Sequence, residues 1–182
     1  LSINELAEVL PGHVQKNFLA THFFNPPRYM RLLEIIPCQQ SDPNMIKDIS
    51  DFIASRLGKG IVYGKDTANF IANRVGVFSM YNTFKHMMEM DLTVEQVDAV
   101  VGTATGKPRS AAFRTADLVG LDTMVHVGTN SYDAAPDDEA RDTFIAPDFI
   151  KGMIEKGLLG NKTKQGFYRK EMIDGKRQIY YY

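Results

Sequence analysis

Two patterns of hydrophobic and polar positions divide this chain near residue 65. In residues 1–64, short apolar runs alternate with amphipathic stretches, which predicts part of an α/β sheet. In residues 65–168, apolar positions recur at the three-to-four-residue spacing of helices, which predicts an all-α domain. Residues 169–182 place Asp174-Gly175 between two β-prone arms, which predicts a hairpin, an extended tail or a linker.

The first part contains the predicted strands. Residues 3–10 form a helical pattern, in which Ser2 is the expected N-cap and Glu5 its partner in a capping box. The run 17–24, NFLATHFF, is compact and apolar, which is typical of a buried parallel strand. The other expected elements are a strand at 29–37, a helix at 43–57 that Ser41 or Asp42 caps and Gly58 ends, and a strand at 60–64.

The second part contains helices of different lengths. Asp66 or Thr67 is the expected cap of the longest, which runs to about Met90 and carries a wide apolar stripe for a core or an interface. Thr93 and Gln96 have the spacing of a capping box at the start of the next helix. Shorter helices are expected around residues 111–119, 122–132 and 147–156.

Composition and charge exclude several kinds of partner. The formal net charge of −1, spread over interspersed acidic and basic residues, leaves no cationic face for a phosphate backbone, so nucleic acid is not an expected partner. No apolar run approaches the roughly 18 residues of a membrane span, and the N-terminus lacks the pattern of a signal peptide. We therefore expect a cytoplasmic protein. The single cysteine, Cys38, can form no internal disulfide; we expect it to be buried, and we expect no metal site.

Two polar residues in the mostly apolar stretch HFFNPPRYMRLLEI are candidates for catalysis. His22 ends the first predicted strand, where the carboxyl ends of parallel strands open into ligand crevices. Glu34 lies in the next strand, close to its predicted C-terminal end, and the turn at Asn25-Pro26-Pro27 can return its carboxylate to the imidazole. A histidine oriented by a carboxylate is the usual arrangement of a general base. The alternatives are a hydrogen-bonded core histidine and a solvated carboxylate at a strand edge.

Three further polar residues have structural and functional interpretations. Asn25 precedes two prolines and is typical of a turn. Asn73 lies among apolar neighbours of the long helix, where a buried amide needs a partner. Lys162 either reaches a phosphate or hydroxyl group or is a solvated loop lysine. No G-x-G-x-x-G follows a strand, so either the domain binds no dinucleotide by that device or the front of a Rossmann unit is missing.

Four motifs, in order along the chain, resemble the L-3-hydroxyacyl-CoA dehydrogenase family: THFFNPPRYMRLLEI, LGKGIVYGKDTANFIANRVG, DLVGLDT and GNKTKQGFY. Their details are similar to bacterial fusion proteins in which this dehydrogenase precedes an enoyl-CoA hydratase-like region. The resemblance implies that residues 1–64 are the C-terminal remnant of a Rossmann NAD-binding domain. It also implies that residues 65–168 form a helical domain like the C-terminal domain of 6-phosphogluconate dehydrogenase. The family's glycine-rich loop and active-site serine would precede Leu1, so we expect a truncated fragment.

The resemblance also implies roles for individual residues. His22 matches the catalytic base, and Glu34 matches its carboxylate partner. Asn73 matches an asparagine that binds and polarises the substrate. Asn25 matches an asparagine near the nicotinamide, and Lys162 matches a lysine that approaches NAD from the C-terminal segment.

The implied reaction is the oxidation of L-3-hydroxyacyl-CoA to 3-ketoacyl-CoA by NAD in fatty acid β-oxidation. The implied partners are the acyl-CoA substrate, a second copy of the chain bound through the helical domain and, in the full-length protein, a thiolase. The fragment itself is expected to be inactive. Two alternatives stay open: a dimerisation and docking module without catalysis, and a sister dehydrogenase that acts on a hydroxy acid without CoA.

Overall fold

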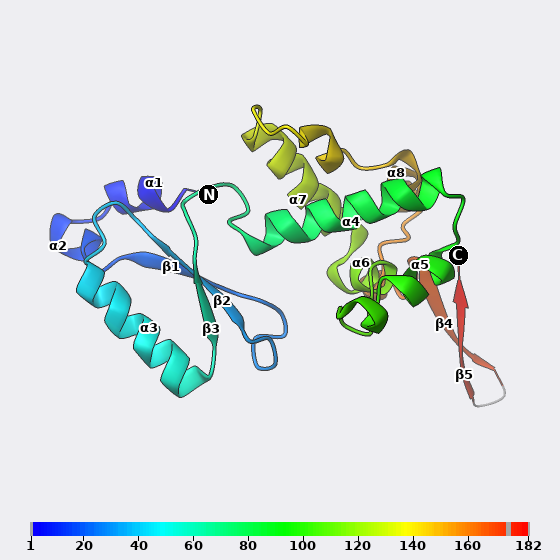
Figure 1. Cartoon of the computed structure of the whole chain (residues 1–182), viewed down its shortest axis with the longest axis horizontal. Coiled ribbons are helices and arrows are strands. Elements are labelled where there is room, and N and C mark those ends of the chain that lie inside the picture. Colours follow the sequence, from blue (N-terminus) through cyan, green and yellow to red (C-terminus); the bar gives the residue numbers. More distant parts are fainter. Residues whose placement is uncertain (1, 174–175, 182) are drawn as a thin grey trace. The chain divides into compact units, whose positions relative to one another are not determined.

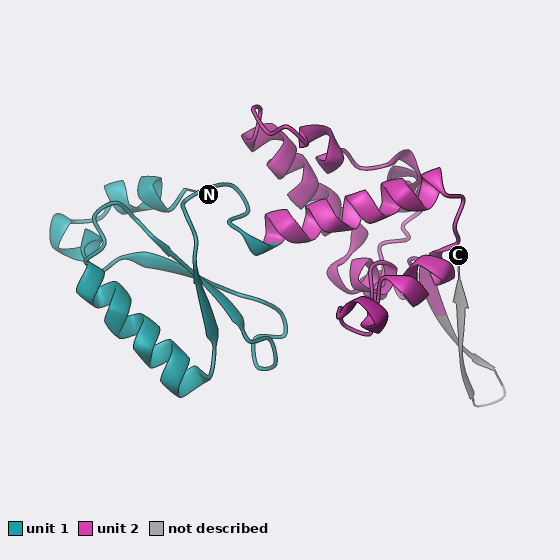
Figure 2. Ribbon diagram, viewed as in Figure 1, with its two compact units in different colours: residues 1–72 teal, residues 73–182 magenta. Residues whose placement is uncertain are grey.

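The structure, a computed structural model, describes residues 2–173 and 176–181, with side chains described as far as Arg169. The chain forms two compact units, Leu1–Ala72 and Asn73–Tyr182, which are coloured teal and magenta in Figure 2. Within the described residues, no helix has both the length and the apolar character that a membrane crossing requires.

Unit 1 is a three-stranded sheet with helices packed on it (Figure 1). The strand order is β1-β2-β3, with β2 antiparallel to β1 and parallel to β3. The elements in chain order are α1 (Ile3–Glu8), α2 (Gly12–Gln15), β1 (Leu19–Phe23), β2 (Leu32–Pro37), α3 (Pro43–Leu57) and β3 (Gly60–Tyr63).

The prediction of a buried parallel strand at 17–24 is wrong, because β1 runs antiparallel to its only neighbour in the described sheet. A parallel pair needs a crossover of about a dozen residues or more, whereas residues 24–31 form a connection too short for one. The antiparallel register places His22 directly opposite Glu34. Glu34 is the third residue of β2, so the prediction that it lies close to the C-terminal end of its strand is also wrong.

Alternation along β2 decides which side chains share a face with the site. Successive side chains of a strand point to opposite faces of the sheet. Leu33 and Ile35 pack against α3, whereas Ile36 packs against α1. Glu34 has the parity of Ile36, so it lies on the α1 face, and its side chain is fully buried there.

Local signals in the sequence set both ends of α3, as predicted. The side chain of Asp42 accepts a hydrogen bond from the Asn44 N–H at 2.7 Å, and Pro43 occupies the first turn. Gly58 ends the helix with φ of 63°, a left-handed conformation that glycine adopts without steric cost.

The N-terminus of α1 combines a predicted cap with one from a distant part of the chain. The Ser2 hydroxyl accepts the Glu5 N–H at 3.2 Å, which confirms the N-cap. The Asp66 carboxylate accepts the Ile3 and Asn4 N–H groups at 2.8 and 2.9 Å. Desolvation acts to raise the pKa of Asp66, but its hydrogen bonds together lower it below its ordinary value.

The long helix α4 (Ala72–Glu89) begins at Ala72. The prediction that it begins directly after Asp66 or Thr67 is therefore wrong. Asn69 and Phe70 have φ of 60° and 49°, so the backbone is left-handed there and cannot continue a right-handed helix. Asp66 does not cap α4, since its carboxylate is occupied by α1.

Unit 2 is helical and ends in an antiparallel pair of strands, β4 and β5, which corresponds to the hairpin among the alternatives for residues 169–182 (Figure 1). Thr93 and Gln96 form the predicted capping box, with bonds of 2.8 and 3.3 Å between each side chain and the other's N–H. The predicted hairpin turn, Asp174-Gly175, lies outside the described residues. After α4 the elements are α5 (Val94–Val100), η1 (Thr103–Thr105), α6 (Phe113–Val119), α7 (Leu121–Ala134), η2 (Arg141–Phe144), α8 (Asp148–Glu155), η3 (Asn161–Thr163), β4 (Tyr168–Ile173) and β5 (Lys176–Tyr181).

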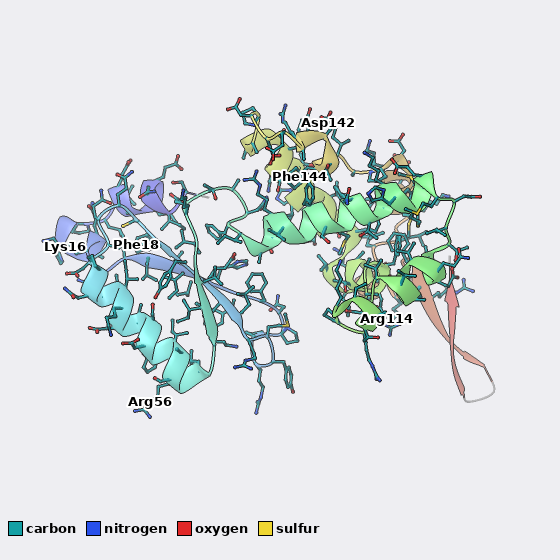
Figure 3. The ribbon with its side chains drawn as sticks, viewed as in Figure 1. Lys16, Phe18, Arg56, Arg114, Asp142 and Phe144 are labelled. Carbon is teal, nitrogen blue, oxygen red and sulfur yellow. The ribbon has the colours of Figure 1, made fainter. Side chains whose placement is uncertain are left out.

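Aromatic side chains form the core of unit 2. Phe84 of α4 is fully buried and stacks on Phe113 of α6, with ring centroids 4.8 Å apart. Phe167 meets the Phe113 ring edge-on at 4.6 Å. The ring of Phe144 of η2, labelled in Figure 3, meets that of Phe78 of α4 edge-on, with ring centroids 5.9 Å apart. The long helix is therefore the central element of this core.

A buried carboxylate joins the motifs DLVGLDT and GNKTKQGFY. Asp117 accepts the N–H groups of Phe167 and Tyr168, both at 2.9 Å. Burial raises the pKa of Asp117, although the two N–H groups act in the opposite direction. A Cβ atom on Gly166 would overlap the Asp117 carboxylate, so only glycine fits there. These motif residues have a structural role in holding the C-terminal segment against α6.

Candidate active site

The antiparallel pair of β1 and β2 brings His22 and Glu34 together, as the sequence predicts. Nδ1 of His22 lies 2.6 Å from Oε2 of Glu34. The imidazole side chain is 28% exposed, whereas the carboxylate is fully buried. The pair thus consists of a buried carboxylate and a histidine whose side chain is partly exposed to solvent.

The second oxygen of Glu34 explains how a carboxylate can be buried at this point. Oε1 accepts the backbone N–H groups of Ile71 and Ala72 at 3.0 and 2.7 Å. Both groups lie where the chain enters α4, and N–H groups at a helix start have no partner within the helix. Glu34 therefore satisfies these donors and holds His22 with the same carboxylate.

Two aromatic rings lie against the imidazole. Neither is among the site residues predicted from the sequence. The Phe24 ring centroid is 4.5 Å from that of His22, at an interplanar angle of 55°. The Phe70 centroid is 5.7 Å away at 56°. Period-2 alternation in the run THFF could have identified Phe24 as a neighbour of His22, since the two share a face. No local pattern identifies Phe70, which is distant in sequence.

Asn25 lies just beyond the end of β1, in the turn that joins β1 to β2. Its side chain is exposed, and the peptide bond to Pro26 is cis. The ammonium group of Lys59 donates to the carbonyl oxygens of Pro27 and Met30, the latter at 2.7 Å. This lysine ties the turn to the start of β3.

Asn73 and Lys162 belong to unit 2. Asn73 is half-buried and directly follows Ala72, so its Cα lies about 3.8 Å from the Cα of a residue that donates to Glu34. Lys162 lies in η3, and its ammonium group forms an ion pair with Asp122 at the start of α7. The hydrogen bond from Lys162 is the main reason why the pKa of Asp122 is lowered.

The geometry of the pair allows proton transfer at one nitrogen. An ionised carboxylate only accepts hydrogen bonds, so Nδ1 of His22 donates to Glu34. Nε2 then carries the free lone pair of a neutral imidazole. The arrangement can accept a proton at Nε2 and stabilise the resulting imidazolium through the buried carboxylate.

Two family models together match most of the chain. The model of the 3-hydroxyacyl-CoA dehydrogenase NAD binding domain matches residues 1–67. The model of the 3-hydroxyacyl-CoA dehydrogenase C-terminal domain matches residues 70–170. His22 and Glu34 fall within the first match, and Asn73 and Lys162 fall within the second.

Several proteins similar to this chain are named 3-hydroxyacyl-CoA or 3-hydroxybutyryl-CoA dehydrogenases. A probable 3-hydroxyacyl-CoA dehydrogenase of Bacillus subtilis is 47% identical over 94% of this chain and 22% of its own length. One from Deinococcus radiodurans is 46% identical over 86% of this chain and 44% of its own length. The crystal structure of (S)-3-hydroxybutyryl-CoA dehydrogenase PaaH1 from Ralstonia eutropha matches 91% of this chain and 56% of that chain, with a TM-score of 0.77 and 27% identity. The chain thus spans less than half the length of these two curated relatives.

Proposed function

The chain belongs to the 3-hydroxyacyl-CoA dehydrogenase family, and on that premise we propose that the full-length protein oxidises L-3-hydroxyacyl-CoA to 3-ketoacyl-CoA. NAD+ is the oxidant, and the reaction belongs to fatty acid β-oxidation. The observation that carries the proposal is the 2.6 Å contact between His22 and the buried carboxylate of Glu34.

His22 is the base in the proposed reaction. Its Nε2 takes the proton of the 3-hydroxyl group, while a hydride leaves C3 and the C3–O bond becomes a carbonyl. Glu34 keeps the proton of the neutral imidazole on Nδ1 and stabilises the imidazolium that forms. Asn73 offers an amide that can donate to the substrate carbonyl, and it directly follows Ala72, which is hydrogen-bonded to Glu34.

Two side chains of this chain fit NAD. The exposed amide of Asn25 carries both a donor and an acceptor, which match those of a nicotinamide carboxamide. The ammonium group of Lys162 is 44% exposed and can attract a phosphate. When bound, NAD+ supplies the acceptor for the hydride.

The proposed partners follow from the family and from the exposed surface of unit 2. We propose that two copies of the chain dimerise through the helical domain, where several large apolar side chains are exposed. Thiolase is the proposed partner of the full-length protein, and the cytoplasm is its proposed location. The exposed apolar side chains of unit 2 include Val75, Met88, Met90, Val100, Leu118 and Val119.

The substrate class can be tested with the purified full-length protein. NADH formation is followed with L-3-hydroxybutyryl-CoA, with its D isomer, and with hydroxy acids that carry no CoA. The proposal predicts turnover of the L thioester alone. Turnover of the free acids in its place would identify a sister dehydrogenase, and dimerisation without turnover of any substrate would identify a docking module.

A further inference from the structure

The hydrogen bond to Glu34 does not by itself fix the orientation of His22. A single bond to Nδ1 still allows rotations about the Cα–Cβ and Cβ–Cγ bonds of His22, and these rotations displace Nε2. The contacts that can prevent this are the rings of Phe24 and Phe70, whose planes are tilted by 55° and 56° to the imidazole. Tilted aromatic pairs at these centroid distances are favourable.

Phe70 differs from Phe24 because its backbone also serves the pair. Its φ of 49° places it in the left-handed region, which bulky residues rarely adopt. The next two N–H groups along the chain, those of Ile71 and Ala72, are the donors to Glu34 Oε1. One short turn therefore presents a ring to His22 and two donors to Glu34.

The Phe70 side chain is anchored by the core of unit 1. It is half-buried and packs against the cluster of buried side chains on the α1 face of the sheet. An anchored ring can limit the motion of a neighbour that is itself partly exposed, as His22 is. The buried members of this cluster are Ile3, Ala7, Ile36 and Cys38.

We propose that Phe70 is a positioning residue for the His22–Glu34 pair. Its ring holds the imidazole so that Nδ1 stays on Glu34 and Nε2 stays where the hydroxyl proton must be taken. This role rests on the proposed function, because Phe70 acts on the reaction through His22. Misplacement of a catalytic group by about 1 Å can cost on the order of 10²-fold in rate.

Two substitutions separate the ring from the backbone. Phe70→Leu keeps an apolar side chain without the ring, and Phe70→Gly removes the ring while glycine readily adopts the left-handed φ. Phe18→Leu is the matched control, because Phe18 (Figure 3) packs against the same cluster. Among the described residues the ring contacts of His22 are those with Phe24 and Phe70, so the control leaves them intact.

The first measurement needs no activity. The ¹⁵N shifts of the His22 ring in this chain report which nitrogen carries the proton. We expect the Nδ1–H tautomer in the wild type and in Phe18→Leu, and a mixture of tautomers in Phe70→Leu and Phe70→Gly. If Phe70→Gly, still folded by circular dichroism, keeps the wild-type tautomer, the ring does not position His22 and the proposal is overturned.

The second measurement uses the full-length enzyme. Phe70→Leu should lower kcat on the order of tenfold or more with little change in KM, since the ring acts on the base and not on substrate binding. Wild-type kcat in Phe70→Leu would overturn the proposal. Failure of the proposed function has a different signature: the wild-type enzyme would then not oxidise L-3-hydroxyacyl-CoA, or His22→Ala would oxidise it at the wild-type rate. The tautomer result in this chain would stand by itself in either case.

Discussion

Glu34→Gln keeps the size of the buried side chain but replaces one oxygen with an NH₂ group. The N–H groups of Ile71 and Ala72 both need an acceptor, so the remaining oxygen of the glutamine should stay with them. The NH₂ group then faces Nδ1 of His22, in place of the oxygen that now lies 2.6 Å away, and it donates to that nitrogen. The imidazole proton moves to Nε2, which can no longer accept one from the substrate.

The expected loss of stability is smaller than the roughly 5–15 kcal/mol by which native domains are stable. A hydrogen bond to a charged acceptor stabilises by about 1.5–3 kcal/mol, and a neutral one by about 0.5–1.5 kcal/mol. Two N–H bonds that become neutral should cost about 2–3 kcal/mol together, and removal of a buried charge offsets part of this. The variant should therefore remain folded. Loss of the base should lower kcat by about 10²–10⁴-fold.

The assay is the steady-state formation of NADH by the full-length protein, together with thermal unfolding of each variant. Glu89→Gln is the matched control, because Glu89 pairs with His86 at 2.9 Å on the exposed surface of α4. It should leave kcat unchanged. A folded Glu34→Gln enzyme with wild-type kcat would refute the tautomer argument.

Three further predictions concern stability and the cofactor. The folded-state pKa of Asp66 is lowered, so the contribution of this carboxylate to stability is complete above about pH 5 and is lost as the pH falls through the unfolded and then the folded pKa. Asp66→Asn should flatten this fall in urea titrations, and parallel pH curves for the two proteins would contradict it. Phe84→Ala should lower the free energy of unfolding by about 3–5 kcal/mol, whereas Phe52→Ala, at a side chain that is 54% exposed, should cost far less in the same denaturation experiment. Lys162→Ala should raise the KM for NAD+ in steady-state assays. Its Tm should stay unchanged, because an exposed ion pair such as that with Asp122 contributes only about 0–1 kcal/mol. A lower Tm with unchanged KM would indicate a structural lysine.

Elements whose signals are local could be predicted from the sequence. Asp42, Pro43 and Gly58 delimit α3 because each acts on backbone groups within a few residues. The start of α4 could not be predicted in the same way. Asp66 is a good cap by residue type, but its carboxylate binds the N–H groups of α1, more than 60 residues away in sequence. Competition between near and distant donors is decided by tertiary packing.

The candidate site also combines features that local sequence predicts with features that depend on tertiary packing. The turn at Asn25-Pro26-Pro27 is enough to predict that His22 and Glu34 meet, and they do. The same turn makes β1 and β2 antiparallel, which conflicts with the parallel strand that the apolar run 17–24 suggests. Apolar composition reports burial and not strand direction, so the connection length was the better guide. The donors to Glu34 and the ring of Phe70 depend on a left-handed turn that residue types do not reveal.

The most direct test of the central claim is the kcat of His22→Ala for L-3-hydroxyacyl-CoA oxidation in the full-length protein, beside that of His13→Ala. His13 is an exposed residue of α2 and serves as the control. If His22 is the base, its replacement should lower kcat by about 10²–10⁴-fold, while His13→Ala keeps the wild-type rate. A folded His22→Ala enzyme that turns over as fast as the wild type would contradict the assignment of this pair to catalysis.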